Sequence, residues 1–559
     1  MFIPATCQET ASLGWDRLDV VLITGDAYID SPFIGVAVIG KVLISAGYRV
    51  GIIAQPDIHT DKDIKRFGEP ELFWGITGGS IDSLVANYTA SQKKRKQDDF
   101  TPGGINNKRP DRAVIAYTNL VRRFFKNTKP IVIGGIEASL RRIAHYDFWS
   151  DQIRRSILLD AKADILVYGM GEKTILELSE QLKNKQNHEN IKGISYISQT
   201  PRPDYLELPD FDLVSRDKSA FSKMFTIFYN NCDPITGKGL YQQYGNRYII
   251  QNPPNTYLTQ DELDAVYNLD FQRDLHPSHR NDGPVRALET IRFSITTHRG
   301  CYGECNFCAI SIHQGRTVRW RSEESIVKEA VQLTMHHDFR GNILDVGGPT
   351  ANMYGFECKK KITIGACRDQ RCLFPDICPS LRPDHRKLIQ LLRKIKKING
   401  IKNVFIASGP RYDLVLADRK WGTGYLEEIV RFHISGQLKI APEHSENHIL
   451  KLMGKPGHQS LTKFKDLFFR LSKLAGKNQF LTYYFIAAHP GCHERDMQSL
   501  REYASKKLKI HPEQIQIFTP TPSTYSTLMY YTQQNPFSHQ KIFVEKNTER
   551  KMKQKKILI

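Results

Sequence analysis

The sequence contains no run of about 20 consecutive apolar residues, the length that a helix needs to cross a bilayer. Its N-terminus, Met1-Phe2-Ile3-Pro4, lacks the charged and then apolar layout of a secretory signal. Cysteine is scarce, with ten in 559 residues, which excludes a disulfide scaffold. These absences predict a cytoplasmic protein with no membrane association.

Acidic residues are outnumbered by basic ones, 59 to 79, which gives a formal net charge of +20. Such an excess suits a polyanionic partner such as RNA, because phosphates bind Lys and Arg. The surplus is spread widely, however, and a composition rich in Lys, Ile and Asn also arises from mutational bias in the coding DNA. RNA therefore stays open as a partner. The length predicts two or three domains.

Short β-branched runs alternate with helical patterns over residues 1–190, as in βαβ units around a parallel sheet. Strands are predicted at 20–24, 49–54, 72–77, 130–133 and 163–168. We expect an α/β domain with a doubly wound, flavodoxin-like parallel sheet. Residues 191–288 are rich in Pro, Asp, Asn and Tyr, and we interpret them as an irregular connector.

The alternation of strands and helices resumes over residues 289–530. Strands are predicted at 291–296, 342–346, 403–407, 437–441, 481–487 and 514–518. Helices are predicted at 323–335, after the N-cap candidate Ser322, and at 386–398, before Asn399-Gly400. Six such units predict a partial (β/α)6 barrel, with its chemistry at the carboxyl ends of the strands. Residues 531–559 form a basic C-terminal tail that we expect to be disordered.

The first barrel strand runs into a loop with the spacing Cys-x3-Cys-x2-Cys, formed by Cys301, Cys305 and Cys308. Three thiolates can hold three irons of a [4Fe-4S] cluster and leave the fourth iron open to chelate a small molecule. A zinc knuckle is the alternative, but a structural zinc site needs four ligands and this loop supplies three. The place of the loop at a barrel mouth favours a cluster.

This spacing, with the aromatic Phe307 before the last cysteine, resembles the hallmark of the radical S-adenosylmethionine (SAM) superfamily. The resemblance implies that the open iron binds SAM, and that an electron from the cluster cleaves SAM to methionine and a 5'-deoxyadenosyl radical. It implies that the three cysteines are the cluster ligands and that Phe307 lies beside the adenine. It also implies an electron donor such as flavodoxin or ferredoxin.

Polar and glycine residues follow the later barrel strands. Gly347 and Gly348 are similar to the Gly-Gly-Glu element that contacts the methionyl amino group in the superfamily, although Pro349 replaces the acidic residue. A glycine turn that serves only the strand-to-helix geometry is the alternative. Further candidates for contacts with the ribose and carboxylate of SAM, each also explained by a rim ion pair, are Ser408, Arg411, Lys439 and Glu443.

A second cysteine group lies in a basic insertion at 358–378, formed by Cys358, Cys367, Cys372 and Cys378. Four thiols in a segment with little apolar content favour a second metal site. An auxiliary iron–sulfur cluster and a structural zinc are both chemically sensible, and unligated thiols are the alternative.

The barrel segments 444–457, 485–491 and 518–522 are similar to the methylthiotransferase and elongator branch of the superfamily. That branch carries features that this chain lacks, including a second cluster on three N-terminal cysteines. Residues 1–190 resemble the cobalamin-binding domains fused to many radical SAM enzymes, but Pro32 stands where their cobalt-ligating His lies. Cobalamin without His ligation, or a scaffold alone, both remain open.

The combination of Gly25-Asp-Ala-Tyr28, Gly134-Gly-Ile-Glu-Ala-Ser-Leu-Arg-Arg142 and Gly347-Gly-Pro-Thr-Ala-Asn-Met-Tyr354 closely resembles the YgiQ-type bacterial radical SAM family. The resemblance implies an N-terminal radical SAM-associated domain, a radical SAM barrel and a [4Fe-4S] cluster with SAM, and it names no substrate. The sequence thus predicts a radical SAM enzyme. The alternatives are an RNA-modifying enzyme, a cobalamin-assisted methyl-transferring enzyme, and a non-enzymatic RNA-binding protein stabilised by metal.

Overall fold

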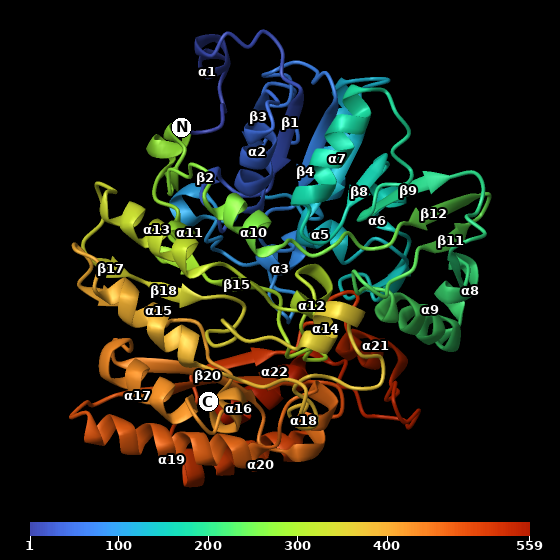
Figure 1. Cartoon of the computed structure of the whole chain (residues 1–559). Helices are drawn as coiled ribbons and strands as arrows, with labels where there is room; N and C mark the ends of the chain where they lie inside the picture. Colours follow the sequence, from blue (N-terminus) through green and yellow to red (C-terminus); the bar gives the residue numbers. More distant parts are fainter. The chain divides into compact units, whose positions relative to one another are not determined.

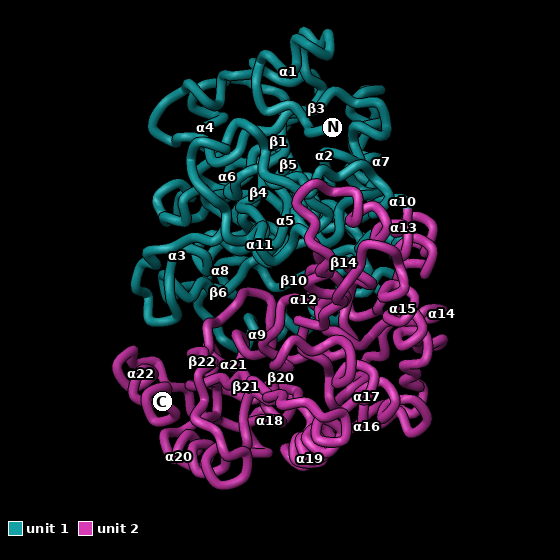
Figure 2. Tube along the Cα trace, turned by 90° about the vertical axis from the view of Figure 1, so that its left-hand side faces the viewer, with its two compact units in different colours: residues 1–258, 265–292 teal, residues 259–264, 293–559 magenta.

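The computed structural model describes all residues, 1–559, and divides into two compact units that are described separately (Figure 2). Unit 1 comprises residues 1–258 and 265–292, and unit 2 comprises residues 259–264 and 293–559. None of the helices combines the length and the apolar composition that a membrane span requires.

Unit 1 is built on a sheet whose centre is parallel. The five predicted strands are present as β1 (Val20–Thr24), β3 (Val50–Ala54), β4 (Phe73–Thr77), β5 (Ile131–Gly134) and β8 (Ile165–Val167). They pair in parallel in the order β3-β1-β4-β5-β8, which is the flavodoxin-like order. All five residues of β1 are buried, as expected of a strand whose two faces are both covered.

Helices cover both faces of this sheet (Figure 1). Helix α2 (Gly35–Ser45) packs against α7 (Glu172–Lys183), and α4 (Ala113–Phe124) packs against α6 (Ile157–Ala161). Helix α2 connects β1 to β3, and α4 connects β4 to β5 in the opposite direction across the sheet. Because crossovers between parallel strands are right-handed, these two helices lie on opposite faces of the sheet. Because these strands are parallel, the carboxyl ends of β1, β4 and β5 lie at one edge of the sheet.

Residues 191–288, expected to be an irregular connector, instead extend the sheet. Strand β9 (Ile194–Ser198) is antiparallel to β8, β12 (Arg247–Gln251) is antiparallel to β9 and to β11 (Leu240–Tyr244), and β10 (Leu206–Leu208) forms the edge. Helices α8 (Phe211–Arg216) and α9 (Lys218–Asn230) lie in the same segment. Strand β11, with the sequence Leu-Tyr-Gln-Gln-Tyr, buries one face and leaves the other partly exposed. It therefore lacks the continuous apolar run by which the central strands were predicted.

Unit 2 contains the six predicted barrel strands. They are β14 (Ser294–Thr296), a second strand split into β17 (Asn342–Ile343) and β18 (Asp345–Gly347), β19 (Asn403–Val404), β20 (Gln437–Glu443), β21 (Phe480–Ala487) and β22 (Gln514–Ile517). Parallel ladders join β14 to β18, β17 to β19, and β20 to β21 to β22. The first strand begins later than predicted because residues up to Ile291 belong to helix α11 (Arg286–Ile291).

The helices of unit 2 pack apolar faces onto these strands. Both predicted helices are confirmed, as α13 (Glu323–Thr334) and α15 (Arg386–Lys396). The N-cap prediction is also confirmed, since the Ser322 hydroxyl accepts a hydrogen bond from the Ser325 N–H at 3.1 Å. Leu388, Leu392 and Ile395 recur at helical spacing on α15 and are all buried in the core.

The C-terminal tail, expected to be disordered, ends in helix α22 (Thr548–Leu558), which packs on α20 (Glu494–Tyr503) and β22. Its Lys551 Nζ donates to the Tyr530 hydroxyl at 2.8 Å, and Gln554 Oε1 accepts from the Ala488 N–H at 3.0 Å. Leu558 joins the barrel core. Tertiary contacts, rather than a strong apolar period, therefore order this helix.

Candidate functional site

The cysteine loop follows β14 and is fixed at both ends. Strand β15 (His298–Arg299) pairs with β16 (Arg319–Trp320), and a Cβ on Gly300 would lie 2.3 Å from the Thr317 carbonyl oxygen, so glycine is required there. In the middle of the loop, the Asn306 N–H donates to the Met453 carbonyl at 2.9 Å. The Asn306 side-chain amide donates to the Leu452 carbonyl at 2.8 Å. The loop is therefore anchored to the chain after β20.

The three thiols of the loop lie close enough to influence one another. Burial, together with the neighbouring Cys305, raises the pKa of the Cys301 thiol to about 11 and that of the Cys308 thiol to about 12. The Gly303 N–H donates to Cys301 Sγ at 3.3 Å, and Arg411 Nη1 donates to Cys305 Sγ at 3.6 Å. Buried thiols with raised pKa values become thiolates when a metal supplies compensating charge.

Gly303 leaves open space beside these sulfurs. A Cβ at this position would lie 3.2 Å from Cys301 Sγ, 3.6 Å from Cys305 Sγ and 3.1 Å from Arg411 Nη1. Three thiols from one loop, a glycine cradle and N–H donors aimed at sulfur fit the requirements of a [4Fe-4S] cluster with one open iron.

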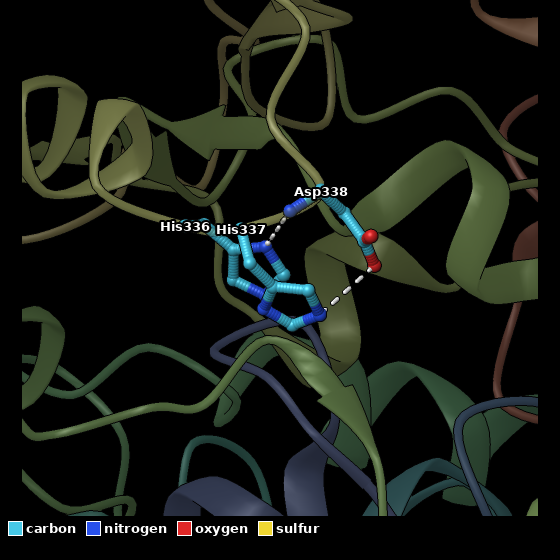
Figure 3. Close-up of side chains that lie close together, drawn as sticks. All are labelled: His336, His337 and Asp338. Carbon is cyan, nitrogen blue, oxygen red and sulfur yellow. Dashed lines mark hydrogen bonds and ion pairs between the residues drawn. The ribbon is translucent and has the colours of Figure 1, made fainter.

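A compact group of possible metal ligands lies outside the cysteine loop. His336, His337 and Asp338 place their ligand atoms within 4.8 Å of one another. That group is a turn of consecutive residues after α13, with His337 Nε2 3.4 Å from Asp338 Oδ2 (Figure 3). Its closeness follows from the turn itself, and we assign it no function.

Arg411, which follows β19, is positioned by several contacts. Its guanidinium holds the Asp413 carboxylate in two hydrogen bonds, from Nε at 2.8 Å and from Nη2 at 2.6 Å. Its backbone N–H donates to Asn352 Oδ1 at 2.7 Å, and Asn352 Nδ2 lies 3.0 Å from His385 Nε2. Asn352 thus joins the Gly-Gly-Pro-Thr-Ala-Asn segment to the arginine beside Cys305.

Glu443, at the end of β20, is buried next to this group. Burial raises the pKa of its carboxyl, while the charges of Lys455 and Arg411 oppose that effect. Lys455 Nζ lies 3.8 Å from Glu443 Oε1 and donates to the Ala441 carbonyl at 2.7 Å. Sequence analysis missed Lys455 and Asp413, and a basic residue in the Gly454-Lys455-Pro456-Gly457 turn after β20 was the one available signal for Lys455.

The remaining predicted residues lie around the same strand ends. A Cβ on Gly347 would lie 3.2 Å from the Ser408 hydroxyl, and a Cβ on Gly348 would lie 2.7 Å from the His298 ring. Ser408 donates its hydroxyl hydrogen to Asp345, so this group is already engaged. Lys439 is half-buried, on the opposite face of β20 from the core residues Leu438 and Ile440.

Phe307 is half-buried and makes an edge contact with His489, with ring centroids 6.5 Å apart. His489 follows β21 and its Nε2 lies 2.7 Å from the Ser526 hydroxyl. Burial lowers the pKa of His489 to about 3, so its ring is neutral at pH 7. An apolar ring in the cysteine loop, next to a neutral imidazole, suits a flat uncharged ligand group such as adenine.

The edge of unit 1 where a cofactor would lie is closed by the chain's own residues. Arg109 is buried between Asp26 and Asp98, with Nη1 2.7 Å from Asp26 Oδ1 and Nη2 3.0 Å from Asp98 Oδ2. Its Nη1 also donates to the Gly78 carbonyl at 2.8 Å. A Cβ on Gly79 would lie 2.2 Å from Asp26 Oδ1, so the turn after β4 is packed directly against this pair.

The segment before Arg109 covers the same edge. Gln55 Nε2, after β3, donates to the Gly25 carbonyl at 2.9 Å and to the Thr101 hydroxyl at 2.7 Å. Asp30, in the place of the cobalamin motif, pairs with buried Lys41 at 3.1 Å. The contacts of Arg109 and Gln55 cover the turns at this edge, so these residues do not fit a cobalamin lying over it, and we derive no chemistry through it.

The chain matches the "Radical SAM N-terminal" family over residues 2–294 and the "Radical SAM superfamily" over residues 295–504. A UPF0313 protein of Fusobacterium nucleatum is 57% identical over 100% of this chain and 98% of its own length. A UPF0313 protein of Thermotoga neapolitana is 48% identical over 99% of this chain and 98% of its own length. A UPF0313 protein of Methanocella arvoryzae is 49% identical over 97% of this chain and 90% of its own length.

One similar solved structure is that of the methyltransferase TsrM of Kitasatospora setae with cobalamin and a [4Fe-4S] cluster bound. It is 13% identical to this chain with a TM-score of 0.49, and the match covers 91% of this chain and 77% of TsrM. The cobalamin-dependent enzyme OxsB is 15% identical with a TM-score of 0.48, over 93% of this chain and 55% of its own. The family matches and the full-length relatives decide the assignment: this chain belongs to the UPF0313, or YgiQ-type, family of radical SAM enzymes, which use SAM and a [4Fe-4S] cluster.

Proposed function

We propose that this chain holds its [4Fe-4S] cluster on Cys301, Cys305 and Cys308 and cleaves SAM there. The observation that carries the proposal is the set of three half-buried, neighbouring thiols around the Gly303 cradle, with Arg411 donating to Cys305. When bound, such a cluster supplies one electron that breaks a carbon–sulfur bond of SAM, which gives methionine and a 5'-deoxyadenosyl radical.

The charged residues beside the loop match the amino and carboxylate groups of SAM. Arg411 already holds Asp413 in two hydrogen bonds, so Lys455 is the cation with donor capacity left for the carboxylate. Glu443 offers a negative charge for the ammonium group, and its burial excludes competing water. Phe307 would lie along the adenine, and Gly348 would contribute backbone contacts, while Lys439 and Ser408 stay as peripheral candidates.

Anaerobic reconstitution with iron and sulfide, followed by SAM and dithionite, tests the proposal. We expect 5'-deoxyadenosine and methionine in equal amounts from the wild type and neither from Cys301→Ala. Cys7→Ala is the matched control, because Cys7 is exposed in unit 1 and should leave product formation unchanged. Iron-loaded wild type that forms no more 5'-deoxyadenosine than Cys301→Ala would contradict the assignment.

The role of Lys455 gives a finer test of the same site. Lys455→Met removes one charge-assisted hydrogen bond to the SAM carboxylate, which contributes about 1.5–3 kcal/mol, so we expect the Kd for SAM to rise about 10- to 100-fold. Iron content should stay at the wild-type value, because Lys455 is no ligand. An unchanged Kd would remove Lys455 from the SAM site.

RNA is a second candidate for the substrate, favoured by the net charge of +20. Crosslinking in cells, followed by sequencing of bound RNA, would show enrichment of particular transcripts, and recovery equal to that of an untagged strain would exclude it. We propose a flavodoxin or ferredoxin as the electron donor. None of the ten cysteines forms a disulfide, which suits the reducing cytoplasm that we propose as its compartment.

A further inference from the structure

The insertion between β18 and α15 is a segment with little regular structure and four of the ten cysteines. Its one helix is α14 (Lys359–Ile364), which begins directly after Cys358. Cys358 and Cys372 are buried, 4% and 8% exposed, in a small core with Leu373, Leu381 and the ring of Tyr302. A segment this short has too few apolar side chains to specify its fold alone, and metal ligation is the usual way to stabilise one.

A buried cation is aimed at one of these sulfurs. Lys361, only 2% exposed, donates from Nζ to Cys372 Sγ at 3.5 Å. Its carboxylate neighbour, Glu304 Oε2, lies farther away at 3.8 Å, and Glu304 is shared with Arg316 at 3.3 Å. A buried ammonium requires a compensating negative charge, and a metal-bound thiolate at Cys372 supplies one.

Three of the four cysteines of the insertion, Cys358, Cys372 and Cys378, lie in or against the same small core. The Cys378 N–H donates to the Cys372 carbonyl at 2.9 Å, and Cys378 packs against the residues around Tyr302. Cys367, half-buried, follows three residues after α14 ends. Four thiolates suit both a structural zinc ion and an iron–sulfur cluster, and metal and sulfide counts distinguish the two.

We propose that the insertion holds a second iron–sulfur cluster, bound by Cys358, Cys367, Cys372 and Cys378. In a cluster each thiolate binds a different iron, so the sulfurs stand farther apart than around one ion. The buried Lys361 then acts as a hydrogen-bond donor to a cluster sulfur. Four cysteines complete the coordination of the cluster, which leaves no iron open for SAM.

The second cysteine group and the first cysteine loop pack against the same small core. Tyr302, the neighbour of Cys301 in the chain, is fully buried in the core that contains Cys358 and Cys372, and Cys301 packs against the same core. Arg371, next to Cys372, donates to the Glu304 carbonyl within the first loop at 3.0 Å. The second cluster would therefore fix the insertion that supports the loop of the first.

Iron and sulfide counts test the proposal with the full-length chain. A His336→Ala/His337→Ala background removes the compact histidine group as a source of adventitious metal. After anaerobic reconstitution we expect about eight irons and eight sulfides per chain in this background, and about four of each in the triple variant Cys301→Ala/Cys305→Ala/Cys308→Ala. The corresponding triple variant of Cys358, Cys372 and Cys378 should also hold about four. Cys232→Ala is the control that should keep about eight.

The variant without the first three cysteines decides the question even if changes in the insertion prevent folding, because it keeps all four proposed ligands. Its Mössbauer spectrum should show a cluster although it forms no 5'-deoxyadenosine. Fewer than one iron per chain in this variant would overturn the second cluster and leave the SAM proposal intact. One zinc per chain in anaerobically purified protein, lost with the Cys358, Cys372 and Cys378 changes, would also overturn it.

Discussion

Arg109 gives the largest stability effect that we predict in unit 1. Its side chain is 0% exposed, and the Asp26 and Asp98 carboxylates that it holds are 1% and 2% exposed. Arg109→Ala would leave both carboxylates buried without this cation. Removing one partner of a buried ion pair costs about 3–5 kcal/mol, because an uncompensated charge stays in a low-dielectric interior. We expect the free energy of unfolding of unit 1 to fall by about this amount.

Hydrogen exchange measured by mass spectrometry can locate this effect. A loss of about 3–5 kcal/mol corresponds to about 100- to 5,000-fold faster exchange in the peptides that contain β1 and β4. Peptides of β20 and β21 in unit 2 serve as a reference within the same sample. The matched control is Arg17→Ala, because Arg17 pairs with Glu71 at 2.7 Å while its side chain is 74% exposed. Water screens an exposed pair of this kind, so exchange should change little.

A change in Arg109→Ala no larger than that in Arg17→Ala would refute the reasoning. The double variant Arg109→Ala/Asp98→Ala gives a second check. Because it removes a charge of each sign, its destabilisation should be smaller than the sum of the two single variants.

Three further predictions concern the cluster site, the sheet edge and acid stability. Gly303→Ala places a methyl group beside the sulfurs of Cys301 and Cys305 and should lower iron loading several-fold. Gly424→Ala is the control, because a Cβ there would have no atom within 4 Å, and iron loading should stay unchanged. This control change should also stabilise α17 (Gly422–Phe432) by about 0.4–1 kcal/mol. Chain incubated with hydroxocobalamin and desalted should retain no cobalamin absorbance, and a stoichiometric amount would show that the edge closed by Arg109 opens. Burial lowers the pKa values of His145 and His489 to about 3 in the folded chain. As the pH falls below 6.5, these histidines are therefore protonated in the unfolded chain while they stay neutral in the folded chain. Stability should then fall by up to about 1.4 kcal/mol per pH unit for each histidine, and a thermal midpoint that is flat between pH 7 and pH 5 would contradict this.

The central strands and the cysteine loop could be predicted because their signals are local. Val20–Thr24 is an uninterrupted apolar run, and such a run fits a strand covered on both faces wherever it occurs. The N-cap at Ser322 likewise depends on residues within one turn. The outer strands of the sheet and α22 could not be predicted, because Gln242, Lys551 and similar polar residues are buried through partners far away in the chain.

The sequence by itself determined the central strands of the sheet, the Cys-x3-Cys-x2-Cys spacing at Cys301 to Cys308 and the resemblance to the family. Only the tertiary structure decided which charges meet at that loop. Arg411, Glu443 and Lys455 come from three separate segments, and burial of distant residues in one place, rather than any local pattern, joins them. The same holds at the edge of unit 1, where Asp26, Asp98 and Arg109 close the turns over which a cofactor would lie. Local periodicity follows from backbone geometry, whereas charge pairing across the fold depends on packing that no single segment encodes.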